Sequence, residues 1–434
     1  MTDTLVLCLH DTVVGELRQG QDSSRVRLDI DSAYDASGVA LTESFSVVPG
    51  TEPPTDRVSN FLGGYVPEGH HRMVMASRRG IDAGDLFALL REFGGSMAGA
   101  VTARAPSSPT AAISGRLEEL SDQHLADLLR QAVRDTDQAV PDDSRSTLPG
   151  FQPKVLVTRI DGVWAQPHGT AHSTYILKPQ VPNREARLVD EHYGHLLAQH
   201  AGLSEFTSEL LEVDSVSFLA IERFDRHVGR GGTVELIHQE DAAQALGLDW
   251  RTADAKFQNH LRPDDPTRAS AARVAAMLAQ VPAGSAIVQD WARRFVFGLV
   301  LGDNDAHAKN LALLHTEFGA SLAPAYDTVP NLFQREMIDE GFRLALAVNG
   351  SFDHRRVSID SMVAEVESWA TMTSRRAAAL VESAVGAYAQ AVEQVAEPAG
   401  ISPGLADKLR WTVDQLNSGE PIGVSPWQKV VPTR

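Results

Sequence analysis

The chain has 434 residues, 43% of them hydrophobic and 22% charged, which is ordinary for a globular protein built from two or three packed subdomains. It carries 39 lysines and arginines against 57 aspartates and glutamates, a net charge of −18. Because nucleic-acid affinity depends on neutralising phosphates, we do not expect it to bind DNA strongly unless a basic partner supplies the contacts, although the charge could also serve only solubility.

The single cysteine, Cys8, stands in the apolar run 5–9 and is expected to be a small buried strand residue. One cysteine excludes an intramolecular disulfide and a cysteine-based metal site. The N-terminus lacks the pattern of a signal peptide, and no apolar run of about 18 residues is present, so we expect no membrane span and a cytoplasmic location.

The first hundred residues predict short strands and helices. Strands are expected at 5–9 and 13–17, which form a hairpin, at 25–30 and at 98–103. Helical periodicity covers 56–79 and 82–93. A stretch rich in Pro, Ser and Ala, 105–112, is predicted to be a linker or long loop, and Ser121 begins another helix.

A small antiparallel sheet with one inserted helix is predicted at about 147–224. Its strands are expected at 154–160, 163–166, 174–178, 209–213 and 217–224, with a tight Asp161-Gly162 turn between the first two. The inserted helix is 185–200, and Gly202 ends it.

The remainder is predicted to be mainly helical. Apolar residues recur every fourth position from Ile287 to Leu299, which indicates a buried helix that runs into Gly302. Short strands are expected at 311–314 and 322–326, the second ending beside Asp327. Helices rich in Ala and Val, such as 377–395, fill the last hundred residues.

Two side chains after that buried helix, Asp305 and Asn310, have the five-residue spacing of a kinase catalytic loop. There the aspartate orients the attacking hydroxyl and the asparagine binds Mg²⁺, and Asp327 stands where a kinase places its other Mg²⁺-binding aspartate. Spacing alone is a weak signal, because Asp303, Asn304 and Asp305 could equally form a turn or cap. The preceding helix and the following Asp327 favour the catalytic interpretation.

A candidate phosphate cradle is the loop 148–154, which enters a predicted strand. Its Gly150 would let backbone amides approach a phosphate, although an ordinary turn could have the same composition. Lys178, at the end of the strand 174–178, can direct its ammonium at the α- and β-phosphates, or it could be a surface lysine. Glu191 on the next helix could pair with Lys178 or lie on a solvated helix face.

Five segments together resemble the HipA family, the kinase toxins of bacterial HipBA toxin–antitoxin modules. They are Leu148-Pro149-Gly150-Phe151-Gln152-Pro153-Lys154, Ile221-Glu222-Arg223-Phe224-Asp225-Arg226, His238-Gln239-Glu240-Asp241, Gly302-Asp303-Asn304-Asp305-Ala306-His307-Ala308-Lys309-Asn310 and Pro324-Ala325-Tyr326-Asp327. They stand in the family's order and at its approximate spacings, and the Asp-x-His-Ala-Lys-Asn string is rarely met outside it. The N-terminal block, with Gly99-Ala100-Val101 near its end, resembles the family's N-terminal domain, so the resemblance covers nearly the whole chain.

The resemblance implies an α+β, two-lobed protein-kinase-like fold with an N-terminal α/β subdomain and an all-helical C-terminal lobe. Three regions are expected: the N-terminal subdomain at 1–110, a kinase-like N-lobe with phosphate-binding loop, sheet and hinge at 111–225, and a mainly helical C-lobe with the catalytic loop at 226–434. The implied cofactors are ATP and Mg²⁺.

The resemblance also implies roles for single residues. Asp305 would be the catalytic base, with Asn310 and Asp327 as the metal ligands. The ATP-binding residues would be Gly150, Phe151, Gln152 and Lys154 of the covering loop, Lys178 on the phosphates, Glu222 and Phe224 of the hinge, and His307 and Lys309 of the catalytic loop. We expect His307 to brace that loop, and Asp241 could cap the helix after it.

Members of the family phosphorylate themselves on a serine of the phosphate-binding loop, which ejects the loop and inactivates the kinase. Thr147 stands at that position here, with Ser146 and Ser144 upstream, and the departure from serine leaves self-inactivation open. The implied partners are a protein substrate, an aminoacyl-tRNA synthetase in the best-known case, and a HipB-like helix-turn-helix antitoxin. The antitoxin would supply the DNA contacts for co-repression of the operon, and the complex could contain a dimer of this chain.

Two other classes of function share part of this pattern. A small-molecule phosphotransferase of aminoglycoside-kinase type has the same Asp-x-x-x-x-Asn spacing but not the longer string at 305–310. A non-catalytic scaffold or co-repressor with a decayed site is opposed by the presence of Lys178, Asp305, Asn310 and Asp327. We therefore predict an ATP-dependent serine/threonine protein kinase that acts as the toxin of a HipBA-like system.

Overall fold

The structure is a computed structural model of the chain, and it describes residues 4–106, 115–135, 148, 152–184, 186–229, 233–334 and 341–427. The chain divides into two compact units. Unit 1 comprises residues 1–181, 206–253 and 313–320, and unit 2 comprises residues 182–205, 254–312 and 321–434. The domain boundaries expected at 110 and 225 stay a prediction.

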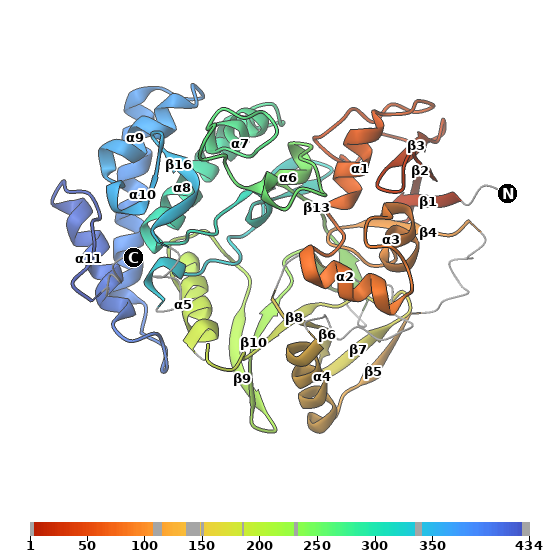
Figure 1. Cartoon of the computed structure of the whole chain (residues 1–434), viewed down its shortest axis with the longest axis horizontal. Coiled ribbons are helices and arrows are strands. Elements are labelled where there is room, and N and C mark those ends of the chain that lie inside the picture. Colours follow the sequence, from red (N-terminus) through yellow and green to blue (C-terminus); the bar gives the residue numbers. More distant parts are fainter. Residues whose placement is uncertain are drawn as a thin grey trace. The chain divides into compact units, whose positions relative to one another are not determined.

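The N-terminal part of unit 1 is a four-stranded antiparallel sheet packed with three helices (Figure 1). The strands lie in the order β3-β2-β1-β4, and their bounds are β1 (Thr4–Leu9), β2 (Thr12–Gln19), β3 (Val26–Ile30) and β4 (Val101–Arg104). The helices are α1 (Thr55–Gly63), α2 (Gly69–Arg78) and α3 (Leu86–Phe93). Leu7, Leu17, Phe61 and Leu90 belong to one buried core, and Cys8 is a free buried strand residue, as predicted.

The single helix predicted at 56–79 is wrong, because two helices, α1 and α2, occupy this range. The helix α1 ends at Gly63, where a Cβ would lie 2.2 Å from Cγ of the Trp250 side chain. At Gly64 a Cβ would lie 2.2 Å from Cγ of Gln244. Pro67, in the connection that follows, has no N–H with which to continue a helix. Packing against residues far along the chain therefore ends α1 where periodicity alone would extend it.

Unit 1 also holds a six-stranded antiparallel sheet in the order β5-β7-β6-β8-β10-β9. The strands are β5 (Arg116–Glu119), β6 (Val155–Ile160), β7 (Val163–His168), β8 (Tyr175–Pro179), β9 (Ser208–Val213) and β10 (Val216–Glu222). The helix α4 (Asp122–Asp135) shares a buried core with this sheet through Leu125, Leu129, Val157 and Phe218. The helix expected after Ser121 and all five predicted strands are confirmed to within about two residues.

Smaller strands complete unit 1. A hairpin joins β11 (Arg226–Val228) to β12 (Val234–Leu236), and a three-stranded sheet has the order β13 (His238–Asp241), β14 (Ala312–Thr316), β15 (Gly319–Leu322). The helix α6 (Ala242–Ala245) follows β13, and Asp241 caps it: its Oδ1 accepts from Gln244 N at 2.8 Å, and Gln244 Oε1 accepts from Asp241 N at 2.9 Å. The cap expected at Asp241 is confirmed.

The strand predicted at 322–326 is wrong, since β15 ends at Leu322. Pro324 has no N–H for a strand ladder. In unit 2 the next amide, Ala325 N, donates instead to Leu203 O at 2.8 Å. Asp327 therefore follows an irregular segment rather than the end of a strand.

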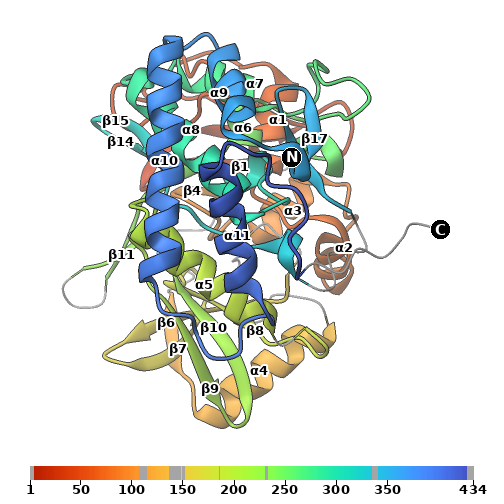
Figure 2. The ribbon, with the colours of Figure 1, turned by 90° about the vertical axis from the view of Figure 1, so that its left-hand side faces the viewer.

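Unit 2 is mainly helical. Its helices are α5 (Ala186–His200), α7 (Ala271–Leu278), α8 (Gly284–Leu301), α9 (Ile359–Ser368), α10 (Ser374–Gln394) and α11 (Leu405–Asn417). Figure 2 shows the long helix α10 beside α11, and the Phe297 and Tyr388 rings join α8 to α10 edge to face at 5.5 Å. The predicted helices 185–200 and 377–395 and the buried helix before Gly302 are confirmed. No helix in the described part of the chain is long and apolar enough to cross a lipid bilayer.

The lobe expected to be all helical also contains a hairpin of β16 (Arg343–Val348) and β17 (Ser351–Asp353). An unbroken apolar run such as 344–348 is compatible with a buried helix or a strand. The turn that follows favours the strand, because Asn349 and Gly350 have φ of +48° and +76°, as a tight hairpin requires. Short 3₁₀ helices complete the lobe: η1 (Ala253–Lys256), η2 (Ala308–Asn310), η3 (Asn331–Phe333) and η5 (His354–Arg356).

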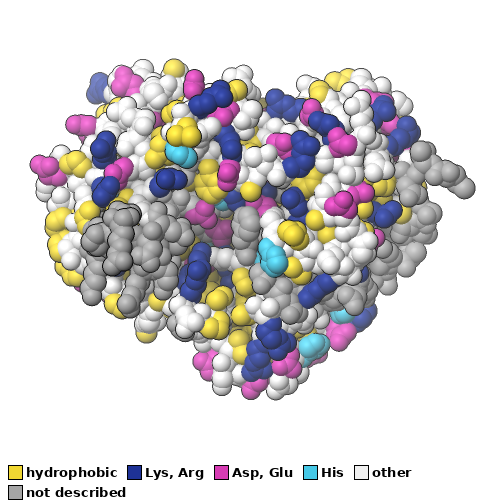
Figure 3. Space-filling model, viewed as in Figure 1, with side chains coloured by type: hydrophobic (Ala, Val, Ile, Leu, Met, Phe, Trp, Pro, Cys, Tyr) yellow, Lys and Arg dark blue, Asp and Glu magenta, His cyan; other side chains and the backbone are white. Residues whose placement is uncertain are grey.

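Charges are interspersed on the described surface of the N-terminal part of unit 1. On the face in Figure 3, basic and acidic side chains alternate over the area of α1 and α3. In this part of unit 1, Arg25 pairs with Asp22 and Asp56, and Arg27 pairs with Glu52. On this face the net negative charge is therefore not gathered into one patch over these elements.

Candidate active site

The helix α8 leads the chain into the predicted catalytic loop and ends at Gly302. Gly302 has φ +76°, in the left-handed region that favours glycine. A Cβ here would lie 2.5 Å from Cε2 of the Phe333 ring, so a side chain does not fit without displacing that ring. Leu332 N donates to Gly302 O at 2.9 Å. The start of the loop is thus attached to the segment that follows Asp327.

Asp303 is buried behind the loop, at a position for which the sequence predicted only a turn. Its Oδ1 accepts hydrogen bonds from Asp305 N at 3.0 Å and from Asn331 Nδ2 at 3.2 Å. Burial raises the pKa of Asp303 well above its usual range, and the carboxylates of Asp305 and Asp327 add to the rise. The turn and the catalytic interpretation are therefore compatible, because the turn closed by Asp303 presents Asp305.

The carboxylate of Asp305 points outward, with 54% of its side chain exposed. His307 Nε2 lies 3.7 Å from Asp305 Oδ1. His307 itself is buried, and its ring meets the Phe257 ring edge to face at 5.0 Å. A buried imidazole at this place fits the bracing role expected for His307. An exposed carboxylate held on a fixed turn is suited to accept a proton from a bound hydroxyl.

Asn310 lies at the other end of the loop, in η2. Its Nδ2 donates to Asp305 O at 2.9 Å, so Oδ1 is the amide atom left for a cation. Oxygen donors such as Asn310 Oδ1 and the Asp327 carboxylate suit Mg²⁺, which commonly takes one or two protein ligands and shares phosphate oxygens. No group of three His, Cys, Asp or Glu side chains in the described ranges could hold a metal alone. The residues present therefore fit a cation shared with a nucleotide rather than a protein-only cage.

Asp327 has φ +50°, a strained backbone conformation for a non-glycine residue. The segment before it is held by Arg294 of α8, whose Nη1 donates to Ala323 O at 2.7 Å and whose Nη2 donates to Pro324 O at 3.0 Å. The same Nη2 lies 3.4 Å from Asn310 O. The half-buried Arg294 thus connects the segments that carry both proposed metal ligands.

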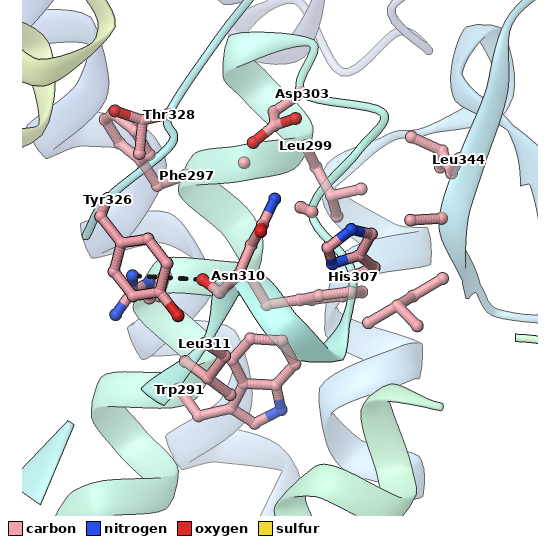
Figure 4. A pocket seen from close by; sticks show the side chains of 16 residues that line it. Trp291, Phe297, Leu299, Asp303, His307, Asn310, Leu311, Tyr326, Thr328 and Leu344 are labelled. Atoms are coloured by element: carbon pink, nitrogen blue, oxygen red, sulfur yellow. Dashed lines mark hydrogen bonds between the residues drawn. The ribbon is translucent and has the colours of Figure 1, made fainter. Parts of the chain in front are cut away.

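Tyr326 forms a second link between these segments. Its hydroxyl donates to Lys309 O at 2.8 Å, and the Arg294 guanidinium lies over its ring, 5.4 Å from the centroid. Figure 4 shows the Asn310 amide between Tyr326 and His307, directed toward Asp303. A cavity of about 40 Å³ lies among these side chains on a largely apolar wall from α8 and β16. The loop's polar groups are therefore held against packed apolar side chains.

Lys178 lies in unit 1, in the strand β8, opposite Leu219 of β10. Its side chain is buried, so it is not a surface lysine. Glu191 lies on α5 of unit 2 and is also buried, with Oε1 3.9 Å from His195 Nε2. The expectation that Glu191 could lie on a solvated helix face is wrong, because it is buried. Its pairing with Lys178 stays a prediction.

The predicted phosphate-binding loop is described only at its two ends. Leu148 is buried in the N-terminal core, Gln152 is half-buried, and the buried Lys154 immediately precedes β6. Four predicted residues lie outside the described ranges: Ser146, Thr147, Gly150 and Phe151. Their roles in ATP binding and self-phosphorylation stay predictions.

The strand predicted to run to Phe224 is two residues too long, because β10 ends at Glu222. Glu222 Oε2 accepts from Thr207 Oγ1 at 2.7 Å. Arg223 N still donates to Thr174 O at 2.9 Å, and the Arg223 side chain forms a buried ion pair with Asp225, Nη2 to Oδ2 at 2.7 Å. The hinge role of Glu222 and Phe224 stays a prediction.

Asp225 is buried and fully bonded. It accepts from both nitrogens of the Arg223 fork, from Arg226 Nη1 at 2.9 Å, from Gly99 N at 2.8 Å and from Gln239 Nε2 at 2.9 Å. Although burial alone would raise the pKa of Asp225, the two guanidiniums hold it well below its usual range. These bonds join the N-terminal segment around Gly99 to later strands of unit 1.

Glu240 forms the second part of this joint. The buried carboxylate accepts from Thr42 Oγ1 at 2.6 Å and from Glu43 N at 2.7 Å, and His315 Nε2 lies 3.0 Å from its Oε1. His238 stacks on the His315 ring at 5.3 Å. We call the residues 223–226 and 238–240 the seam. Two of the five recognised motifs thus supply structural contacts within unit 1.

Three side chains of the candidate site were missed by reasoning from the sequence. Asp303 and Tyr326 stood inside quoted motifs without a role, and Arg294 was not singled out. Arg294 carries a signal that could have been noticed, since it is a charged residue directly before the uncharged, mostly apolar run 295–301 of α8. Its partners are backbone carbonyls of a distant segment, which no local pattern announces.

Two protein-family models match the chain. The model of the HipA N-terminal domain matches residues 5–104, and that of the HipA-like C-terminal domain matches residues 146–398. The second match includes Lys178, Asp305, Asn310 and Asp327, and it spans more than half of the chain.

Relatives match along most of their length. The putative kinase Y4mE of Sinorhizobium fredii is 28% identical over 406 residues, which cover 89% of this chain and 91% of that protein. The serine/threonine-protein kinase toxin HipA of Shewanella oneidensis is 24% identical over 360 residues, covering 81% and 80%. A solved Shewanella oneidensis complex of HipA, HipB and operator DNA matches with a TM-score of 0.77 at 21% identity, covering 94% of this chain and 96% of that chain. These similarities confirm the predicted α+β, protein-kinase-like fold.

Proposed function

The chain belongs to the HipA family, and from this premise we propose that it is an ATP-dependent serine/threonine protein kinase with Asp305 as its catalytic base. One observation carries the proposal. The exposed Asp305 carboxylate lies on a loop whose two ends are bonded to the segment around Asp327. A phosphotransferase needs such a fixed arrangement of proton acceptor and metal ligands.

The chain's own residues would divide the work as follows. Magnesium-bound ATP supplies the γ-phosphoryl group, and the metal neutralises part of the charge that develops on it. Asn310 Oδ1 and the Asp327 carboxylate would hold the metal, and Lys178 would hold the phosphates. Asp305 would orient the substrate hydroxyl and accept its proton as that oxygen attacks the γ-phosphorus, while the bond from the γ-phosphorus to the bridging oxygen breaks and ADP leaves.

A HipB-like antitoxin is the partner that we propose for this kinase. The Shewanella oneidensis structure contains HipA together with HipB and operator DNA. At a net charge of −18, this chain would depend on a basic partner for DNA contacts and for co-repression. We propose a protein substrate, with Thr147 and Ser146 as candidate sites of self-phosphorylation.

The proposal is tested with γ-labelled ATP and Mg²⁺, using the pure protein alone and with cell extract, beside the Asp305→Ala variant. We expect labelled protein with the wild type and a loss of about 10²- to 10⁴-fold with the variant, the usual contribution of a positioned proton acceptor. Asp290→Ala is the matched control, because Asp290 is exposed on α8 and pairs only with Arg293 in the described structure.

Each outcome separates a different alternative. Label transfer that survives Asp305→Ala would contradict the assignment of the base. Absence of both transfer and ATP binding would favour a scaffold, and transfer to an aminoglycoside instead of protein would favour a small-molecule kinase. Mapping the labelled residue decides whether Thr147 or Ser146 accepts phosphate.

A further inference from the structure

The helix α5 of unit 2 presents one face to the segment that follows Asp327. Asp190 and Gly194 stand one helical turn apart, so their Cβ positions lie on the same face of α5. At Gly194 a Cβ would lie only 1.9 Å from Thr328 O, so the absence of a side chain lets α5 approach the residue directly after Asp327. One turn earlier, Asp190 reaches the far end of the same segment.

Asp190 is fully buried and bonded at both carboxylate oxygens. Gln334 Nε2 donates to Oδ2 at 2.9 Å, and Ser402 donates through its backbone N to Oδ1 at 2.8 Å and through Oγ to Oδ2 at 2.6 Å. Burial raises the pKa of Asp190, and the bonds from Ser402 and Gln334 counteract that rise. The carboxylate therefore joins α5, the residues before α11 and the end of the segment at Gln334.

The segment between Thr328 and Gln334 is bonded to the catalytic loop on its other side. Asn331 Nδ2 donates to Asp303 Oδ1 at 3.2 Å, and Leu332 N donates to Gly302 O at 2.9 Å. The buried Lys408 of α11 donates to Phe333 O at 2.7 Å. Every residue from 331 to 334 thus has a partner outside its own segment, with the catalytic loop on one side and the Asp190 helix and α11 on the other.

We propose that Asp190 is a positioning residue that, through Gln334, holds the segment carrying Asp327 in its metal-binding geometry. The proposal rests on the function proposed above. Asp327 has a strained backbone that persists only where its surroundings determine it. Arg294 fixes the chain before Asp327, whereas Asp190 and Gly194 fix the chain after it.

The bond between Asp190 and Gln334 can be broken and restored without changing side-chain size. Gln334→Glu places an acceptor-only carboxylate against the carboxylate of Asp190. Asp190→Asn alone is tolerated, because the Gln334 amide can turn over and offer its oxygen. The double variant Asp190→Asn with Gln334→Glu restores a donor and an acceptor, and Ser402 can still bond to position 190.

The experiment measures the Mg²⁺ concentration that half-saturates binding of a fluorescent ATP analogue to the full chain at pH 8. We expect Gln334→Glu to raise this concentration about 5- to 30-fold, the size of effect that 1 to 2 kcal/mol produces. We expect the half-saturating Mg²⁺ concentration of Asp190→Asn to stay within about twofold of the wild-type value, and that of the double variant to return to the same range. Ser402→Ala, which removes one bond to the same carboxylate without touching Gln334, should lower thermal stability and leave the Mg²⁺ dependence unchanged.

The outcomes distinguish this inference from the function on which it rests. If the wild-type protein shows no Mg²⁺-dependent nucleotide binding, both the proposed function and this inference are contradicted. A wild type that binds, with Gln334→Glu at the same half-saturating Mg²⁺ concentration, overturns the inference alone. Failure of the double variant to recover, while it folds normally, would also overturn it.

Discussion

The seam in unit 1 and the catalytic loop in unit 2 are both rich in charged motif residues, yet they have opposite environments. In the seam, Asp225 and Glu240 are buried, and their oxygens accept bonds from several donors of the same unit. In the predicted catalytic loop, Asp305 has 54% of its side chain exposed, and its backbone N donates to Asp303 Oδ1 while its backbone O accepts from Asn310 Nδ2. Burial keeps external ligands away from Asp225 and Glu240, whereas the exposed Asp305 side chain is accessible to them.

This contrast separates two reasons for which a charged residue can belong to a family motif. Asp225 and Glu240 join pieces of chain that are far apart in the sequence, so their loss should affect folding. Asp305 is exposed and is the proposed catalytic base, so its loss should affect chemistry and leave stability nearly unchanged. The side chains behind the loop, such as Arg294, lie between these extremes and should affect both.

The largest effect on stability is expected from Asp225→Ala in the seam. The substitution leaves the buried guanidiniums of Arg223 and Arg226 without their carboxylate, which costs about 3 to 5 kcal/mol. Urea denaturation measures the loss. Glu209→Ala is the control, because Glu209 pairs with Arg159 at 3.1 Å on the exposed face of the same unit and should cost at most about 1 kcal/mol. Equal losses of unfolding free energy in the two variants would show that the buried seam carboxylate stabilises the fold no more than an exposed one.

Arg294→Lys should have the next largest effect. Lysine keeps the charge but cannot reproduce the fork that binds Ala323 O and Pro324 O, so we expect a loss of about 1.5 to 3 kcal/mol in stability. Since the fork also positions both proposed metal ligands, we expect the half-saturating Mg²⁺ concentration for nucleotide binding to rise about tenfold. The control is the neighbouring Arg293→Lys, at an exposed position of α8. An unchanged Mg²⁺ dependence in Arg294→Lys would show that Arg294, like the seam residues, stabilises the fold without positioning the proposed metal ligands.

A smaller effect is expected from Gly194→Ala. The added Cβ would press on Thr328 O, which should cost about 1 to 2 kcal/mol and weaken Mg²⁺ binding by moving Asp327. Gly386→Ala is the matched control, because Gly386 lies within a helix with nothing within 4 Å of its Cβ position, and alanine favours a helix. The Mg²⁺ dependence of nucleotide binding is measured for both variants. An unchanged Mg²⁺ dependence in Gly194→Ala would show that α5 does not constrain the segment that follows Asp327.

The smallest effect concerns the acid sensitivity of the seam. Burial lowers the pKa of His238 to about 3, with His315 adding to the fall, while the unfolded chain keeps a value near 6.5. As the pH falls below 6.5, the unfolded state binds the proton and the folded state does not, so folding stability is lost until about pH 3. We expect about 1 kcal/mol of loss from this group between pH 6.5 and 5.5.

The variant His238→Gln tests this expectation, because glutamine can still donate to Leu41 O but does not titrate. The unfolding free energy of the variant, measured by urea denaturation at several pH values, should fall less steeply over this interval than that of the wild type. Parallel curves would mean that His238 does not contribute to the acid sensitivity.

Local sequence determined much of the secondary structure and the outline of the site. Strands with alternating residues, helices with a regular apolar face and the spacing of Asp305 and Asn310 follow from short-range geometry, so they were predicted nearly in register. The order of the motifs was enough to identify the family and its fold. These features depend on residues within a few positions of one another.

Tertiary structure decided where elements end and which charged residues are structural. The helix α1 stops at Gly63, where Trp250 packs, and β10 stops at Glu222, directly before the buried pair of Arg223 and Asp225. The roles of Arg294 and Asp190 depend on partners brought together by folding: Asp190 bonds to Gln334 and Ser402, which are 144 and 212 positions away. Burial and hydrogen bonding between distant segments leave no periodic trace in a sequence. For that reason the sequence could suggest candidate catalytic residues, while only the folded chain revealed the contacts that hold them in place.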